Sequence, residues 1–119
     1  MGKPIIWTIA GSDCSGGAGI QADIQAIQGL GGYACSIITA NTAQNSQDVI
    51  AINPVSNKVL GLQLDSLAED MPASVIKIGL LVNQEQVQLV ADKIHQYKDL
   101  WQQTPLVIYD PVAISSTGQ

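Results

Sequence analysis

The sequence predicts a doubly wound α/β fold, in which helices cover both faces of a mainly parallel sheet. Near-continuous apolar runs, typical of strands buried on both faces, alternate along the chain with segments whose apolar residues recur at helical spacing. Such alternation implies right-handed crossovers between parallel strands. Polar stretches follow the predicted strands at residues 11–19, 41–47, 79–83 and 110–118. In this fold class ligands bind at the carboxyl ends of the strands, so we expect a site formed by these loops.

The predicted elements follow in order along the chain. Strands are expected at residues 4–10, 33–40, 49–52, 75–81 and 106–109, and helices at residues 20–30, 56–71 and 83–103. Gly31 and Gly32 are expected to end the first helix with a left-handed cap. Ser56 is a predicted N-cap of the second helix, and Pro72 marks its end. Asn83, with Gln86 three residues later, resembles a capping box at the start of the third.

The stretch IAGSDCSGGAGIQAD, residues 9–23, is the most informative part of the sequence. A strand, a glycine-rich loop and the start of a helix together form a ready site for a polar or anionic ligand. A tight turn without a ligand is the alternative. The loop lacks the lysine of a Walker A motif, which excludes that phosphate loop. A dinucleotide fingerprint fits residues 17–22, but Asn41 and Thr42 stand where the ribose-binding carboxylate is expected.

Three polar side chains are candidates for ligand contacts. Asp23 could bind a ligand or could only complement the helix dipole in the first helical turn. The Gln44 amide offers a donor and an acceptor, which suits a heteroaromatic ring with an amino group beside a ring nitrogen, although it could also stabilise a turn. Asp110 follows the last strand, where such folds place carboxylates that handle a metal or phosphate. Cys14, Cys35 and His95 are interpreted as a loop, a core and a surface residue.

Composition and charge exclude several classes of protein. The net charge of −5 comes with only five basic residues, scattered along the chain, which argues against a nucleic-acid partner. No apolar run is long enough to span a membrane, and no export signal is evident at the N-terminus. Two cysteines form neither a disulfide framework nor a metal-binding spacing. We therefore expect a reduced, cytoplasmic protein of one domain or part of a larger one.

Four segments together resemble the hydroxymethylpyrimidine kinase / phosphomethylpyrimidine kinase family of thiamine biosynthesis. They are IAGSDCSGGAGIQAD, TAQNS at residues 42–46, KIGLL at residues 77–81 and YDPVAISSTG at residues 109–118. The resemblance implies a ribokinase-like fold, a three-layer arrangement with a mainly parallel sheet. It also implies that residues 1–119 are the N-terminal, substrate-binding part of one such domain, because family members are roughly twice as long. The ATP-binding segment and the catalytic base are expected outside these residues.

The resemblance also assigns roles to individual residues. Gly11, Asp23 and Gln44 would contact an aminopyrimidine substrate, and Ala18, Leu80 and Val112 would line its pocket. Asp110 would lie towards Mg²⁺ and the transferred phosphoryl group. Two residues depart from the family pattern: Leu80 stands where methionine is common, and Asn41 is expected to place a polar group near the pocket floor.

The implied activity is phosphorylation of 4-amino-5-hydroxymethyl-2-methylpyrimidine, and then of its monophosphate, by Mg-ATP. None of the 119 residues can be assigned as the base, so we expect the chain to be inactive alone. A homodimer is expected from the resemblance. Two alternatives remain: a pyridoxine or pyridoxal kinase, and a non-catalytic, truncated ligand-binding protein.

Overall fold

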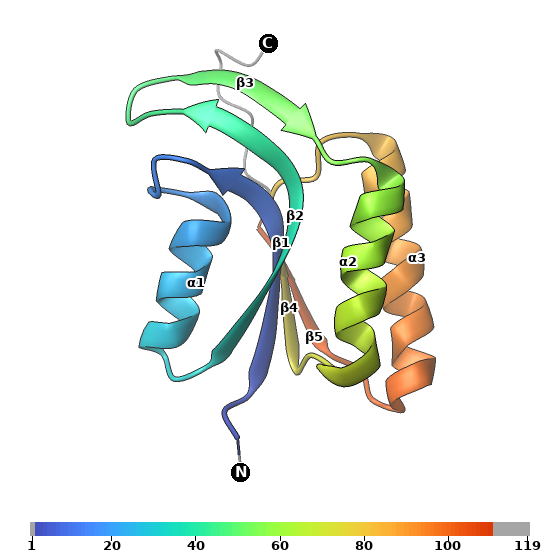
Figure 1. The fold of residues 1–119 in the computed structure, drawn as a ribbon. Coiled ribbons are helices and arrows are strands. Elements are labelled where there is room, and N and C mark those ends of the chain that lie inside the picture. The colour runs from blue at the N-terminus through green and yellow to red at the C-terminus, as the bar shows by residue number, and fades with distance from the viewer. Residues whose placement is uncertain (1, 111–119) are drawn as a thin grey trace.

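A five-stranded sheet forms the centre of the molecule. The computed structural model describes residues 2–110; residues 1 and 111–119 are not described. Its strands are β1 (Ile5–Asp13), β2 (Tyr33–Gln44), β3 (Val49–Pro54), β4 (Val75–Ile78) and β5 (Leu106–Tyr109), arranged in the order β3-β2-β1-β4-β5. All neighbouring pairs are parallel except β2 with β3, which form an antiparallel hairpin that arches over the loop after β1 (Figure 1).

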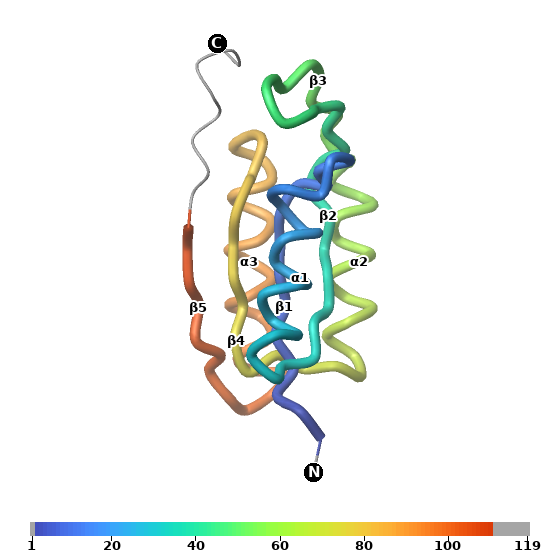
Figure 2. Tube along the Cα trace, turned by 90° about the vertical axis from the view of Figure 1, so that its left-hand side faces the viewer, coloured from blue at the N-terminus to red at the C-terminus, as the bar shows by residue number. Residues whose placement is uncertain are grey.

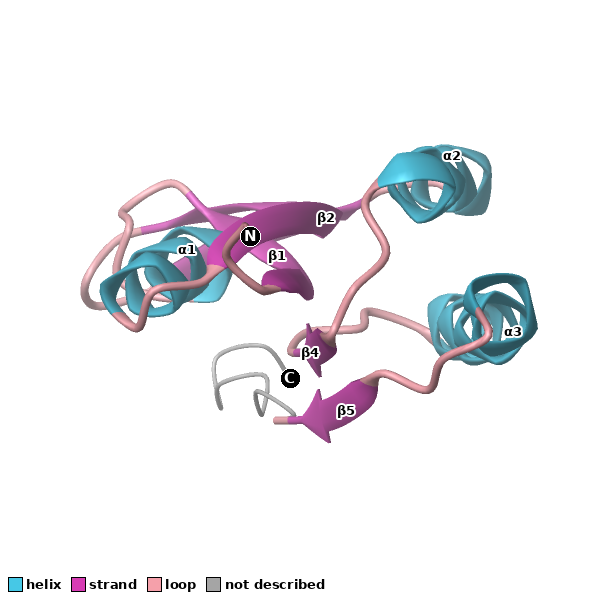
Figure 3. Ribbon diagram, turned by 90° about the horizontal axis from the view of Figure 1, so that it is seen from below, coloured by secondary structure: helices cyan, strands magenta, loops and turns pink. Residues whose placement is uncertain are grey.

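Helices cover both faces of the sheet, which makes the fold three-layered. Helix α1 (Gly19–Gly29) lies on one face, and α2 (Asn57–Asp70) and α3 (Gln84–Trp101) lie side by side on the other (Figure 3). The strand order reverses at β1, because β2 lies on one side of it and β4 on the other. The prediction of a doubly wound, mainly parallel α/β fold is therefore confirmed, and the reversal places the open crevice between β1 and β4.

The predicted helix termini are largely confirmed. The Ser56 hydroxyl accepts a hydrogen bond from the Val59 N–H at 3.2 Å, and the Asn83 side chain accepts one from the Gln86 N–H at 2.9 Å. Gly31 adopts the expected positive φ of 89° after α1. The capping box is only half formed, because the Gln86 amide accepts from the Val82 N–H rather than from that of Asn83.

Strand boundaries differ from the prediction at the carboxyl edge. The segment 41–47, expected to be a loop, is strand as far as Gln44, because its backbone pairs with β3 from Ala40–Pro54 to Gln44–Val49. Only a short turn remains, in which the Asn45 side chain accepts from the N–H groups of Gln47 and Asp48. Strand β1 likewise continues to Asp13, whereas β4 ends at Ile78, earlier than expected.

A bulge at Thr39 interrupts the pairing of β1 with β2. Ala10 pairs with Ile38 and Gly11 with Ala40, so Thr39 is an extra residue in β2. Its hydroxyl donates to the Leu80 carbonyl at 2.7 Å, and its carbonyl accepts from the Val55 N–H and the Gln86 side chain. Thr39 and Gln86 are fully buried, and the bulge thus connects two loops and the start of α3 at the carboxyl edge.

The main core lies between the sheet and the pair α2 and α3. Trp7 of β1 packs edge-on against Tyr97 and Trp101 of α3, with ring centroids 5.9 and 5.2 Å apart. By contrast, the apolar side chains of β5 are 42–62% exposed, and β5 forms one edge of the sheet (Figure 2). Within residues 2–110, no helix has the length and apolar character that crossing a membrane requires.

Candidate functional site

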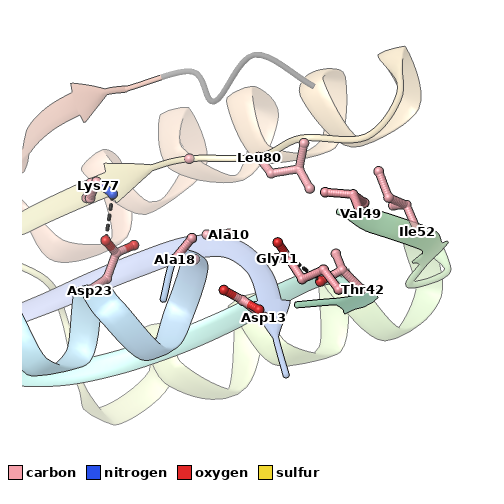
Figure 4. Close-up of a pocket in the computed structure, with 13 residues that line it drawn as sticks. Ala10, Gly11, Asp13, Ala18, Asp23, Thr42, Val49, Ile52, Lys77 and Leu80 are labelled. Atoms are coloured by element: carbon pink, nitrogen blue, oxygen red, sulfur yellow. Dashed lines mark hydrogen bonds and ion pairs between the residues drawn. The ribbon is translucent and has the colours of Figure 1, made fainter. Parts of the chain in front are cut away.

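A cavity of about 190 Å³ opens at the carboxyl edge, where the strand order reverses (Figure 4). Its walls come from the ends of β1 and β4, the start of α1, and the β2–β3 hairpin. Five residues that the sequence predicted to contact or line a substrate site surround this one cavity: Gly11, Ala18, Asp23, Gln44 and Leu80. The sixth, Val112, lies outside the described residues.

Gly19 sets the close approach of α1 to β1. It has a positive φ of 62°, and a Cβ atom at this position would lie 2.3 Å from the carbonyl oxygen of Gly11. Only glycine is compatible with both conditions. The first turn of α1 can therefore lie directly against the end of β1, which brings Ala18 and Asp23 to the cavity wall.

Asp13 places a buried carboxylate inside the glycine loop. Its side chain is 3% exposed and accepts hydrogen bonds from the N–H and hydroxyl of Ser15, at 2.8 and 2.7 Å. Burial raises the pKa of this carboxyl, but the Ser15 bonds, together with the backbone N–H groups of Ala18 and Gly17, lower it below its ordinary value. The loop thus satisfies its own N–H groups with an internal anion, so it is not an open phosphate cradle.

Asp23 is held from two sides by β1 and β4. Its carboxylate accepts from the Thr8 hydroxyl at 2.6 Å and forms an ion pair with the Lys77 ammonium at 2.7 Å. Asp23 also lies beyond the first turn of α1, which contains no acidic residue, so the helix-dipole interpretation does not apply. The ion pair forms part of the cavity wall, where Lys77 and Asp23 are both visible in Figure 4.

The Gln44 side chain takes part in a network that begins on α1. Gln21 accepts from the Asp13 N–H and donates to the Ser12 hydroxyl, both at 2.8 Å. The Ser12 carbonyl accepts from the Thr42 hydroxyl at 2.8 Å, and Thr42 in turn accepts from the Gln44 amide nitrogen at 2.5 Å. These contacts leave one N–H and the carbonyl oxygen of the Gln44 amide for other partners.

The apolar wall of the cavity was only partly predicted. Val49 and Ile52 of β3 line it together with Leu80, and their cross-strand partners are Gln44 and Thr42. Because opposite residues of an antiparallel pair share one face, the alternation of Thr42 and Gln44 could have indicated these contacts. Asn41 was expected near the pocket floor, but this was wrong: it is exposed and points to the other face of β2.

Asp110 follows β5 and does not line this cavity. Its N–H donates to the Ile78 carbonyl at 2.9 Å, and its side chain borders a second hollow that also includes Asp23 and Lys77. Among residues 2–110, no group of three or more His, Cys, Asp or Glu side chains could hold a metal ion. Asp110 can therefore supply one carboxylate, which suits Mg²⁺ held mainly by phosphate and water.

The remaining candidates take the expected positions. Cys14 is an exposed loop residue whose thiol donates to the Gln44 carbonyl at 3.1 Å, and His95 is exposed on α3. Cys35 is buried in the core, and burial, followed by the charge of Asp70, raises the pKa of its thiol. Within residues 2–110, neither thiol has a hydrogen bond to a basic side chain.

Comparison with known proteins points to one family. The family model described as phosphomethylpyrimidine kinase matches residues 13–119. A hydroxymethylpyrimidine/phosphomethylpyrimidine kinase of Bacillus subtilis is 44% identical over 111 residues, 93% of this chain and 39% of the relative. A crystal structure of phosphomethylpyrimidine kinase from Clostridium difficile matches with a TM-score of 0.85 and 38% identity, over 98% of this chain and 48% of that chain.

A kinase for a different ring shares the fold. The ADP complex of Bacillus subtilis pyridoxal kinase matches with a TM-score of 0.81 and 29% identity, over 94% of this chain and 41% of that chain. The 119 residues span less than half the length of the relatives and structures compared. The ribokinase-like fold expected from the sequence is confirmed by these structures.

Proposed function

The chain belongs to the phosphomethylpyrimidine kinase family, and we propose that it supplies the acceptor-binding part of a thiamine-biosynthesis kinase. The proposed reaction is phosphorylation of 4-amino-5-hydroxymethyl-2-methylpyrimidine, and then of its monophosphate, by Mg-ATP. Gly11, Asp23 and Gln44 would contact the ring, and Ala18 and Leu80 would line its pocket, with Val112 proposed beside them from outside the described residues.

One observation carries the choice of ring. The Gln44 amide lies at a cavity with apolar walls and keeps one donor and one acceptor after its bond to Thr42. An aminopyrimidine presents the complementary pair, an amino donor beside a ring-nitrogen acceptor. Buried donors and acceptors that lose their partners are costly, so this pair favours an aminopyrimidine over a ring without an amino group.

Asp23 and Lys77 have a supporting part in this proposal. Their mutual ion pair, with the Thr8 hydroxyl, already satisfies much of the carboxylate, whose side chain is 12% exposed. Asp23 would therefore act on the substrate as a fixed hydrogen-bond acceptor in the wall, with its charge offset by Lys77. Its position is determined by β1 and β4 rather than by the ligand.

Nucleotide and metal belong to the proposal as well. The related pyridoxal kinase was crystallised with ADP, and we propose ATP as the phosphoryl donor here. Mg²⁺, when bound, would neutralise charge on the transferred phosphoryl group, with Asp110 as one carboxylate near it. We further propose that the 119 residues alone do not turn over substrate, because they include no residue assigned as the base.

The test compares three ligands with the purified 119-residue chain. Isothermal titration should show binding of the aminopyrimidine alcohol and its monophosphate, and weaker binding of pyridoxal. Gln44→Ala should abolish the preference, whereas Gln47→Ala, in the nearby exposed turn, should retain it. Tighter binding of pyridoxal would favour the pyridoxal kinase alternative. Incubation with the aminopyrimidine and Mg-ATP should give no product, and any turnover would contradict the proposed inactivity.

Assembly and location are also proposals. A homodimer is expected from the resemblance, and the exposed apolar side chains of β5 offer a surface for self-association. Sedimentation velocity should show a species heavier than the 12.5 kDa monomer; a single monomeric species would contradict association. Both cysteines are free thiols, which fits the proposed cytoplasmic location.

A further inference from the structure

The hydrogen bonds around Thr42 have a direction that chemistry does not allow to reverse. The Ser12 carbonyl lies 2.8 Å from the Thr42 hydroxyl, and a carbonyl can only accept a hydrogen bond. The single hydroxyl proton of Thr42 is therefore used on Ser12. Thr42 then has only lone pairs to offer Gln44, whose side chain lies 2.5 Å away. The atom of Gln44 that faces Thr42 must be a donor, which is its amide nitrogen.

This direction fixes which end of the Gln44 amide is the donor. A glutamine amide has nearly the same shape in its two flipped orientations, so only its partners determine the orientation. Flipping Gln44 would bring two acceptors together, or would require Thr42 to give up its bond to Ser12. The backbone of Gln44 is also held, because its carbonyl accepts from the Cys14 thiol and it pairs with Val49 of β3.

We propose that Thr42 is the specificity-determining residue of the acceptor site, because it locks the order of donor and acceptor that Gln44 presents. The inference rests on the proposed function. An aminopyrimidine offers an amino donor and a ring-nitrogen acceptor; the 4-oxo analogue offers a carbonyl acceptor and a ring N–H donor, the same edge in reversed order. A locked amide binds the first and rejects the second, whereas an amide free to flip accepts both.

Thr42→Val removes the hydroxyl and keeps the β-branched shape, and Thr42→Ser keeps the hydroxyl. Isothermal titration of the 119-residue chain should show that the wild type prefers 4-amino-5-hydroxymethyl-2-methylpyrimidine to its 4-oxo analogue. In Thr42→Val we expect the preference to fall by about tenfold, with the oxo analogue bound more tightly than by the wild type. Thr42→Ser should keep the wild-type preference. A general loss of structure cannot strengthen binding of one ligand. Tighter binding of the oxo analogue would therefore show that the Thr42 hydroxyl fixes the orientation of the Gln44 amide.

A preference in Thr42→Val equal to that of the wild type would overturn the inference and leave the proposed function standing. Thr42→Ala, which adds no bulk, repeats the test if the valine variant does not fold. Nitrogen-15 NMR of the ligand-free chain gives a separate answer: the resonance of the Gln44 side-chain N–H that bonds to Thr42 should move, in Thr42→Val, towards the position of a glutamine N–H without that bond. Unchanged resonances would overturn the inference even if neither ring binds. Failure of both rings to bind would contradict the proposed function.

Discussion

The two faces of β1 have different chemistry, although they alternate residue by residue. Trp7 and Ile9 face α2 and α3 and are fully buried among large apolar and aromatic side chains. Thr8, between them, faces α1 and donates to Asp23, and Ala10 lines the cavity. One face thus provides packing and the other provides polar contacts and space. The strand can be rigid at the site because its other face is anchored.

A pair of similar carboxylates shows the same contrast. Asp23 accepts from a threonine hydroxyl and a lysine ammonium, and Asp65 accepts from the Tyr97 hydroxyl at 2.6 Å and the Lys93 ammonium at 2.9 Å. Asp65 joins α2 to α3 with its side chain 51% exposed, whereas Asp23 joins α1 to β4 with 12% exposed. A hydroxyl and a lysine thus bind each carboxylate. At Asp65 they stabilise the packing of α2 against α3, and at Asp23 they form part of the cavity wall.

The largest expected effect separates the two faces of β1. Trp7→Ala removes a fully buried ring that contacts two aromatic side chains, and we expect a loss of about 3–5 kcal/mol in the free energy of unfolding. Thr8→Val, one residue away, removes only a hydroxyl and should cost about 1–2 kcal/mol. Urea denaturation measures both values. Equal losses would show that the two faces contribute alike.

The next effect concerns the contact of α1 with β1. Gly19→Ala combines a positive φ with a Cβ too close to the Gly11 carbonyl, so we expect a loss of roughly 1–3 kcal/mol and weakened binding of the aminopyrimidine. Gly29→Ala in the same helix meets no atom within 4 Å and should be neutral or stabilising by up to about 1 kcal/mol. Thermal unfolding with and without ligand tests the pair. A Gly19→Ala variant as stable as Gly29→Ala would contradict the close approach.

Removal of each lysine compares the two carboxylates directly. Lys77→Met leaves the mostly buried Asp23 carboxylate with Thr8, and we expect a loss of about 1–3 kcal/mol. Lys93→Met affects a carboxylate that water reaches, so its loss should stay below about 1 kcal/mol. Denaturation at low and high salt measures both. A Lys93 effect as large as that of Lys77 would refute the difference in burial as its cause.

The smallest effect is expected at acid pH. The hydrogen bond from the Tyr97 hydroxyl lowers the pKa of Asp65 below its ordinary value of 3.8. Burial of the carboxyl acts to raise this pKa, and Lys93 acts to lower it further. A carboxyl whose pKa is lower in the folded state stabilises the fold at pH values above its ordinary pKa. This stability is lost as the pH falls through the folded-state pKa. Asp65→Asn should therefore flatten the decline of stability below about pH 4 by a small amount. An unchanged acid limb in urea denaturation would contradict this.

The sequence predicted the layers and the loops that form the site, because those depend on local periodicity and on the rule that parallel strands end at one edge. The family resemblance, not periodicity, assigned Gly11, Ala18 and Leu80 to the pocket, and the strand order came from the structure. The sequence missed the strand character of Thr42 and Gln44, since polar side chains there resemble a loop until β3 pairs with them. It also missed Val49 and Ile52 as cavity residues and the pairing of Lys77 with Asp23. Such contacts join residues far apart in the chain and depend on tertiary register.

The bulge at Thr39 has a consequence for local motion at the site. The N–H groups of Val55 and Val82 belong to loops, yet they donate to the Thr39 carbonyl and to the buried Gln86 amide, both at 2.9 Å. Their protons should exchange with solvent deuterium about as slowly as those in the middle of β1, because opening either loop would expose fully buried polar groups. The segment that carries Leu80 should then open only when the sheet itself unfolds.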